Sequence, residues 1–224
     1  MKPGVHVLDL LETIQRDERT IALIRHSKRD SFNGIPYHLR DTLGINPEGV
    51  RLAQDFGASI RQITPDIRLF LCHTFAKRCE MTAQSIRDGF SAEEQAMILG
   101  CEPEITSPVV NQDKLVKLRN EFEWQGLIQT WLNSNVPEDT LWNPQKYSNM
   151  ILGKLLLYPN IRQGDVLVAV AHDMTFFPLV FSLFGKNVRA IEYLNGIVIS
   201  ANSDIAEIRF RNSEYSFRTE LKIS

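Results

Sequence analysis

Two short apolar runs, each followed at once by charged side chains, stand out in the pattern of hydrophobic and polar positions. Residues 20–25 contain Thr-Ile-Ala-Leu-Ile before an arginine, and residues 166–171 are Val-Leu-Val-Ala-Val-Ala. Apolar runs of this length that are rich in β-branched residues predict buried strands. A third apolar run, at 67–71, follows the turn signal Pro65-Asp66 and predicts a further strand.

Apolar residues at helical spacing separate these strands. They predict helices over residues 5–17, 47–63, 76–90 and 176–184. Residues 30–45 hold glycines and a proline among polar groups and predict a loop. The alternation of strand and helix favours βαβ units and a mainly parallel sheet.

The second half of the chain predicts two additions to this core. Residues 91–163 contain all three tryptophans and helix-like stretches near 113–132 and 145–158. We interpret this segment as a helical insertion over the carboxyl rim of the sheet; a plain helical layer on one face is the alternative. The C-terminal residues alternate in hydrophobicity and predict an antiparallel meander, with strands at 197–199, 206–210 and 215–221.

The predicted fold class is therefore α/β. It is a three-layer α/β/α domain with a mainly parallel central sheet, the helical insertion over the rim and an antiparallel C-terminal edge. A chain of 224 residues, 43% of them hydrophobic, can form this as a single domain spanning 1–224.

Composition excludes several function classes. A net charge of −2 argues against nucleic-acid binding, which would need a basic face. No stretch is apolar enough for a membrane span, and Met1 to Arg19 lacks the apolar core of a signal peptide. The three cysteines form neither a disulfide framework nor a zinc-like spacing. We therefore expect a cytoplasmic protein without metal or other cofactor.

The charged residues that end the two strands carry the candidate chemistry. Arg25, His26 and Arg29 follow the first strand, and His172 and Asp173 follow the second. Ligands of open α/β sheets bind beyond the carboxyl ends of the strands. Several cations and one acid meeting there indicate a phosphate ester as the ligand.

These residues resemble a known family. Arg25-His26-Ser27-Lys28-Arg29 is similar to the Arg-His-Gly-x-Arg signature of the histidine phosphatase superfamily, which includes phosphoglycerate mutases and acid phosphatases. His172-Asp173 resembles the His-Asp motif of the acid phosphatase branch. The segment from Arg78 to Thr82-Ala83, and Asn46-Pro47-Glu48-Gly49, resemble two further family motifs. The resemblance covers roughly residues 20–90 and 164–185.

The resemblance implies a role for each of these side chains. His26 is the candidate nucleophile, because a neutral imidazole can attack phosphorus and form a phosphohistidine. Arg25, Arg29 and Arg78 are the candidate phosphate-binding arginines, since guanidinium groups match phosphate oxygens with forked donors. His172 is the candidate second histidine at the phosphate.

Asp173 is the candidate acid that protonates the leaving oxygen and then activates water. A structural role as a helix cap is the alternative. Mutase-type relatives take a glutamate from the central region instead, so the reserve candidates are Glu102, Glu104 and Asp113. Ser27 departs from the usual glycine, and its hydroxyl could either crowd the phosphate or donate to it.

We therefore expect a metal-independent phosphomonoesterase that hydrolyses a small phosphorylated substrate through a phosphohistidine intermediate. A phosphomutase of the phosphoglycerate mutase type and a non-catalytic, phosphate-binding regulatory member of the same fold are the alternatives. Metal-dependent HD hydrolases also carry a His-Asp pair, but they are all-helical and need further histidines. The natural substrate and the oligomeric state do not follow from the sequence.

Overall fold

The computed structural model describes residues 3–13, 18–92 and 94–223. The helices and strands of this part of the chain, in order, are α1 (Val5–Leu11), β1 (Arg19–Arg25), η1 (Tyr37–Thr42, a 3-10 helix), α2 (Pro47–Ile63), β2 (Leu69–His73), α3 (Lys77–Phe90), β3 (Ala96–Cys101), α4 (Gln112–Glu121), α5 (Trp124–Leu132), α6 (Pro144–Leu156), β4 (Val166–Ala171), α7 (Asp173–Phe184), β5 (Gly196–Ala201), β6 (Ile205–Arg211) and β7 (Ser216–Lys222).

The strands form one mixed sheet. Within the described residues it has seven strands in the order β3-β2-β4-β1-β5-β6-β7. The first four of these are parallel, and β5, β6 and β7 continue the sheet from β1 as antiparallel neighbours. This confirms the predicted α/β class, the parallel core and the antiparallel C-terminal edge.

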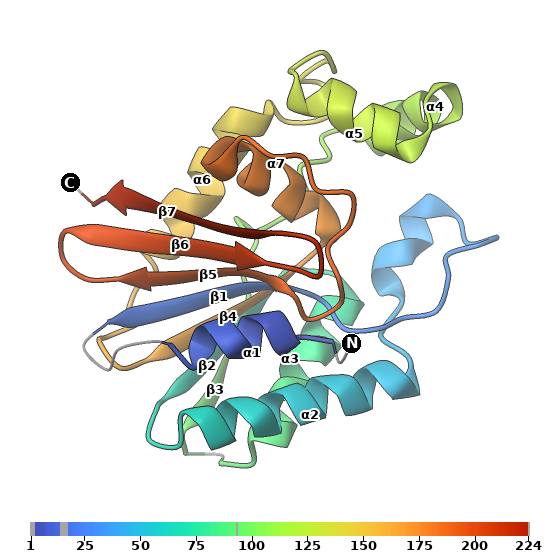
Figure 1. Ribbon diagram of the computed structural model, residues 1–224. Helices are drawn as coiled ribbons and strands as arrows, with labels where there is room; N and C mark the ends of the chain where they lie inside the picture. The colour runs from blue at the N-terminus through green and yellow to red at the C-terminus, as the bar shows by residue number, and fades with distance from the viewer. Residues whose placement is uncertain (1–2, 14–17, 93, 224) are drawn as a thin grey trace.

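Helices cover both faces of the sheet (Figure 1), with α1, α2 and α3 on one side and α6 and α7 on the other. Alternate residues of β1 separate the two cores: Ala22 and Ile24 pack with the first layer, whereas Ile21 and Leu23 pack with the second. This is the two-residue period of a strand buried on both faces.

The start of α2 lies against the loop that follows β1. Asn46 caps the helix through its side-chain oxygen, which accepts the Gly49 N–H at 2.8 Å, and Pro47 occupies the first turn. A Cβ on Gly49 would lie 2.0 Å from the Lys28 carbonyl oxygen. Glycine at position 49 therefore lets the helix start contact the backbone that follows His26.

The predicted helical insertion over 91–163 is wrong at its beginning, because residues 96–101 form strand β3. This strand is parallel to β2 at the edge of the sheet, and Met97 and Leu99 are exposed. A short apolar run with no alternation does not distinguish a strand from a helix in sequence. The rest of the segment is helical, as expected.

Several helix boundaries also differ from the prediction. The first helix ends at Leu11 rather than at 17, and residues 14–17 of that prediction lie outside the described residues. The stretch 113–132 is two helices, because Phe122 and Glu123 have extended backbone. Helix α7 begins at Asp173, three residues early. No helix in the described ranges is long and apolar enough to cross a membrane.

Candidate active site

Pairing of β1 with β4 brings the two histidines together. Arg25 is the register partner of Ala171, and the His26 N–H donates to the Ala171 carbonyl at 3.0 Å. Strands β1 and β4 end at the same level of the sheet. The residues that follow them, His26 and His172, therefore extend from the same edge. The ring centroids of His26 and His172 lie 5.9 Å apart, with an angle of 66° between the planes.

The contacts of His26 define its tautomer. Its Nδ1 lies 2.7 Å from the Ser27 carbonyl oxygen, which can only accept, so Nδ1 carries the proton. In the neutral ring Nε2 then has a free lone pair. Burial, and the neighbouring charges of His172, Arg25 and Arg78, hold the pKa of His26 well below its ordinary value.

His172 has the opposite tautomer. The Arg78 Nη2 donates to its Nδ1 at 3.1 Å, which leaves Nε2–H to donate to the Thr74 hydroxyl at 3.0 Å. Burial comes first among the causes that lower the pKa of His172 well below its ordinary value, followed by the charges of nearby arginines. Both ring nitrogens are engaged by protein groups.

Arg78 lies at the first turn of α3 and is buried. Its Nη1 donates to the Arg40 carbonyl at 2.8 Å and pairs with the Asp41 carboxylate at 3.0 Å. Together with the bond to His172, these contacts use three of its five donors.

The side chains of Arg25, at the end of β1, and Arg29, in the loop that follows, have different surroundings. Arg29 lines the cavity described below, stacks on Phe32 with 3.4 Å from its guanidinium carbon to the ring centroid, and donates to the Asp30 carbonyl. Burial, together with Arg78 and Arg25, lowers the pKa of Arg29.

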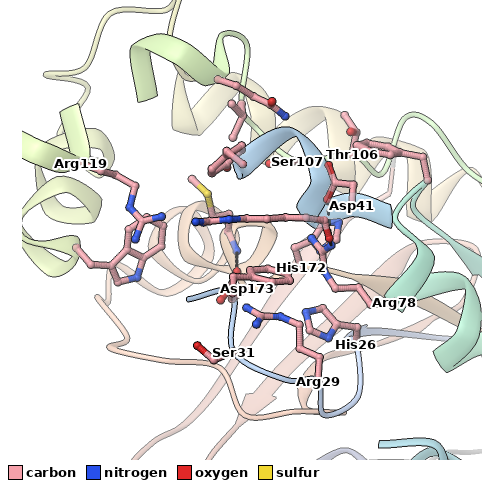
Figure 2. A pocket seen from close by; sticks show the side chains of 18 of the residues that line it. His26, Arg29, Ser31, Asp41, Arg78, Thr106, Ser107, Arg119, His172 and Asp173 are labelled. Carbon is pink, nitrogen blue, oxygen red and sulfur yellow. Dashed lines mark hydrogen bonds and ion pairs between the residues drawn. The ribbon is translucent and has the colours of Figure 1, made fainter. Parts of the chain in front are cut away.

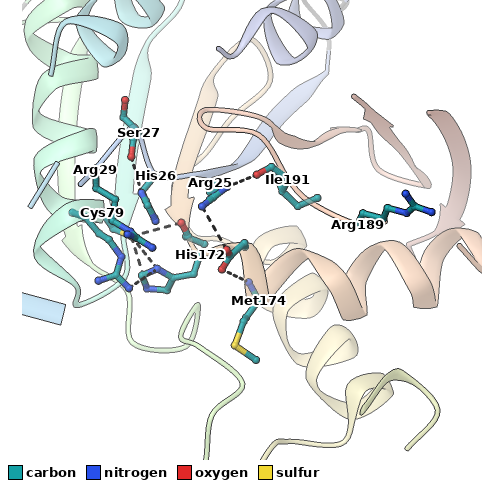
Figure 3. A network of polar contacts seen from close by, with 12 residues as sticks. Arg25, His26, Ser27, Arg29, Cys79, His172, Met174, Arg189 and Ile191 are labelled. Atoms are coloured by element: carbon teal, nitrogen blue, oxygen red, sulfur yellow. Dashed lines mark hydrogen bonds and ion pairs between the residues drawn. The ribbon is translucent and has the colours of Figure 1, made fainter. Parts of the chain in front are cut away.

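Arg25 is not among the described residues that line the cavity. It donates to the Ile191 carbonyl (Figure 3) and faces Asp173 at 3.5 Å. Its guanidinium carbon also lies 4.4 Å from the centroid of the Tyr193 ring. The structure therefore places Arg25 behind Asp173, rather than on the cavity wall where the sequence predicted it.

All three arginines share an unsatisfied donor. The Nε atoms of Arg25, Arg29 and Arg78 are buried and have no hydrogen-bond partner. Buried N–H groups in folded proteins are almost always paired, so an unpaired donor beside a cavity is a candidate contact for a ligand. Arg29 and Arg78 line the cavity, so their two donors would match an oxyanion with several acceptor oxygens.

Asp173 is the first residue of α7, and its side chain is 37% exposed. One carboxylate oxygen accepts the Met174 N–H at 2.9 Å, and the other lies 3.5 Å from Arg25. It lines the cavity next to His172. The reserve acids are elsewhere: Glu102 and Glu104 pair with Lys154, and these two and Asp113 are not among the lining residues.

Neither of the two hypotheses for Ser27 is correct. Its side chain is fully buried, and its hydroxyl donates to the Gly49 carbonyl at 2.7 Å. Its backbone N–H donates to the Thr82 hydroxyl at 3.0 Å. Ser27 therefore ties the loop after β1 to α2 and α3, and it neither crowds the cavity nor donates into it.

A cavity of about 660 Å³ opens in front of these residues (Figure 2). The loop after β1 forms one wall from Ser31 to Asp41, and part of the insertion, from Thr106 to Trp124, forms another. The predicted insertion thus does reach the rim of the sheet, while α6 packs on its face as a helical layer. Both interpretations of 91–163 apply, to different parts of it.

Two residues of the site were missed by the sequence analysis. Asp41 is the second carboxylate among the described lining residues, and it pairs with Arg78. The Tyr193 ring lies 5.8 Å from the His26 ring and under Arg25. Asp41 lies in η1, a short 3-10 helix within the predicted loop 30–45, and Tyr193 follows α7 in an irregular segment, so neither has a spacing that marks it.

Comparison with known proteins identifies the fold. No protein-family model and no curated protein matches the sequence. A phosphoglycerate mutase from Bacillus anthracis str. Sterne has a similar structure, with a TM-score of 0.57 and 16% identity over 84% of this chain and 90% of that one.

A mycobacterial glucosyl-3-phosphoglycerate phosphatase is similar with a TM-score of 0.53 and 11% identity, over 82% of this chain and 91% of that one. The same phosphatase in complex with VO₃ also matches with a TM-score of 0.53, at 11% identity over 81% of this chain and 92% of that one. The chain therefore shares its fold with members of the histidine phosphatase superfamily over most of its length.

Proposed function

We propose that this protein is a metal-independent phosphomonoesterase that works through a phosphohistidine on His26. The observation that carries the proposal is the coincidence of two features in one site. An imidazole with a free Nε2 lone pair lies beside Arg29 and Arg78, which both line the cavity, and their buried Nε donors have no hydrogen-bond partner. The first feature provides a nucleophile, and the second provides donors for a phosphoryl group.

In the first step the Nε2 of His26 attacks phosphorus, and the bond to the ester oxygen breaks. The low pKa of His26 keeps the ring neutral and nucleophilic at physiological pH. The Ser27 carbonyl holds the Nδ1 proton, and it stabilises the positive charge that the ring acquires when it is phosphorylated. Arg29 and Arg78 stabilise the negative charge on the phosphoryl oxygens.

Asp173 enters this step as the carboxylic acid and gives its proton to the leaving oxygen. It then stands as the carboxylate that the Met174 N–H and Arg25 stabilise. In the second step this carboxylate takes a proton from water, which attacks the phosphohistidine. The P–N bond breaks, phosphate leaves, and both His26 and the acid return to their starting states.

The size of the cavity supports a small-molecule substrate. Sites for small molecules typically have volumes of about 300–1,000 Å³, and this cavity has about 660 Å³. Arg119, which lies over the Trp124 ring, is on the far side of Asp173 from Arg78 in Figure 2. The alcohol part of the substrate would bind between Asp173 and this wall of the insertion.

Hydrolysis of an aryl phosphate in excess chelator tests the proposal. We expect release of inorganic phosphate, inhibition by vanadate and a phosphoenzyme that is labile to acid, as a phosphohistidine is. His26→Ala should abolish turnover, whereas His38→Ala, an exposed histidine outside the cavity lining, should not. Loss of activity in chelator, or a phosphoenzyme that persists in His26→Ala, would overturn the mechanism.

Product analysis addresses the two alternatives. Transfer of phosphate between positions of a phosphorylated hydroxy acid without free phosphate would identify a mutase. Binding of phosphate without any turnover, over a screen of phosphorylated metabolites, would identify a non-catalytic member.

A further inference from the structure

Arg78 already holds an anion in this structure. Its Nη1 lies 3.0 Å from a carboxylate oxygen of Asp41, and the same nitrogen donates to the Arg40 carbonyl. A carboxylate and a phosphate present similar oxygen acceptors to a guanidinium. The side chain of Asp41 thus stands where a ligand of Arg78 would be expected.

The segment that carries Asp41 is a closed loop. At its base the Asn46 N–H donates to the Lys28 carbonyl at 3.1 Å, and the Asn46 side chain donates to Asp30 at 2.9 Å. Between these points lies η1, none of whose residues is buried. Two polar contacts join η1 to α3, from the Arg40 carbonyl and the Asp41 carboxylate, and both go to the same nitrogen of Arg78. Earlier in the loop, the Phe32 ring lies against the Arg78 guanidinium. Asp41 is therefore held mainly by the group that would bind the phosphate.

A phosphoryl group and the Asp41 carboxylate cannot both bind Arg78 without cost. The donors left on Arg78 are Nε–H and one Nη2–H, so a phosphate on them lies within a few ångströms of the carboxylate. Like charges at such a separation repel strongly in a partly buried site, where salt and water screen them little. Binding of a phosphoryl group at Arg78 therefore requires the Asp41 carboxylate to move away.

We propose that Asp41 is a specificity-determining residue that competes with the phosphoryl group for Arg78. The inference rests on the proposed function. A substrate offsets the loss of the Asp41–Arg78 pair with the contacts of its alcohol part, whereas inorganic phosphate has no such contacts. Asp41 thereby keeps the affinity for the product low and returns to Arg78 as phosphate leaves.

The test is direct binding of inorganic phosphate, measured by titration calorimetry in the absence of turnover. We expect Asp41→Asn and Asp41→Ala to bind phosphate more tightly than the wild type, by on the order of tenfold. A purely structural role for Asp41 predicts the opposite, because loosening the loop would weaken the site. Asp55→Asn, an exposed change of the same charge on α2, should bind phosphate as the wild type does.

Three outcomes would count against the inference. If the wild type binds phosphate and both Asp41 variants bind it equally or less tightly, Asp41 does not compete, although the proposed function stands. Equal tightening in Asp55→Asn would attribute the effect to net charge. If neither the wild type nor any variant binds phosphate, and Arg78→Ala changes nothing, the proposed function fails together with the inference.

Discussion

Replacement of Asp173 by asparagine tests whether this side chain delivers a proton to the leaving group. Asparagine keeps an oxygen that can accept the Met174 N–H at the start of α7, and it keeps the volume of the side chain. It loses the exchangeable proton and the pairing with Arg25 at 3.5 Å. Because the side chain is more than a third exposed, that ion pair contributes at most about 1 kcal/mol to stability.

The expected effect on turnover is much larger. General acid catalysis typically contributes about 10²–10⁴-fold, which corresponds to about 2.7–5.4 kcal/mol in the activation free energy. This loss applies to alkyl esters, whose leaving alkoxide is a strong base. Nitrophenyl phosphate releases a weak base that needs little protonation, so Asp173→Asn should hydrolyse it with a much smaller loss.

The assay compares kcat/KM for an alkyl phosphate and for nitrophenyl phosphate in the wild type and in Asp173→Asn. Glu104→Gln serves as the matched control, because this carboxylate pairs with Lys154 and is not among the described lining residues. We also expect phosphoenzyme to accumulate in Asp173→Asn with nitrophenyl phosphate, since water activation becomes slow. Equal losses for both esters would refute the reasoning and make Asp173 a structural residue.

Three further outcomes are expected. His26→Ala should lose nearly all turnover but still bind phosphate, as calorimetry can show. The pKa values of His26 and His172 are lowered in the folded state, so below about pH 6.5 the unfolded chain binds more protons than the native one. The unfolding free energy should therefore fall as pH falls, by up to about 1.4 kcal/mol per pH unit for each ring. Urea unfolding at about pH 7 and about pH 5.5 should show this, and His26→Asn should show a shallower pH dependence. Ser27→Ala should lower the unfolding free energy by about 0.5–1.5 kcal/mol, the value of its bond to Gly49, and leave kcat/KM unchanged; a fall in kcat/KM with unchanged unfolding would contradict this.

The parallel core of the sheet was predictable because its strands are buried on both faces. Strands β1 and β4 are therefore continuous apolar runs that end in charged residues, and this pattern also located His26 and His172. Strand β3 was not predictable, since its short apolar run shows no alternation of apolar and polar residues and could equally belong to a helix. Its exposed residues Met97 and Leu99 are themselves apolar, so the alternation of burial in the strand is not visible in the sequence.

The sequence did not predict which way the side chains of the site point. Arg25 and Arg29 flank the same histidine, yet one lies behind Asp173 and the other lines the cavity. That difference depends on Tyr193 and Phe32, on which the two guanidiniums stack. Asp41 pairs with Arg78 from a loop that is closed at its base by contacts of single backbone and side-chain atoms. Such contacts leave no period in the sequence.

The register of β1 against β4 also has a consequence for folding. The two strands that carry His26 and His172 are separated by well over a hundred residues, so their pairing closes a very long loop. Contacts of such high sequence separation form slowly, and after the local helices. During refolding, helical circular dichroism should therefore recover before the site exists. The rate at which phosphate binding recovers would then report how fast β1 pairs with β4.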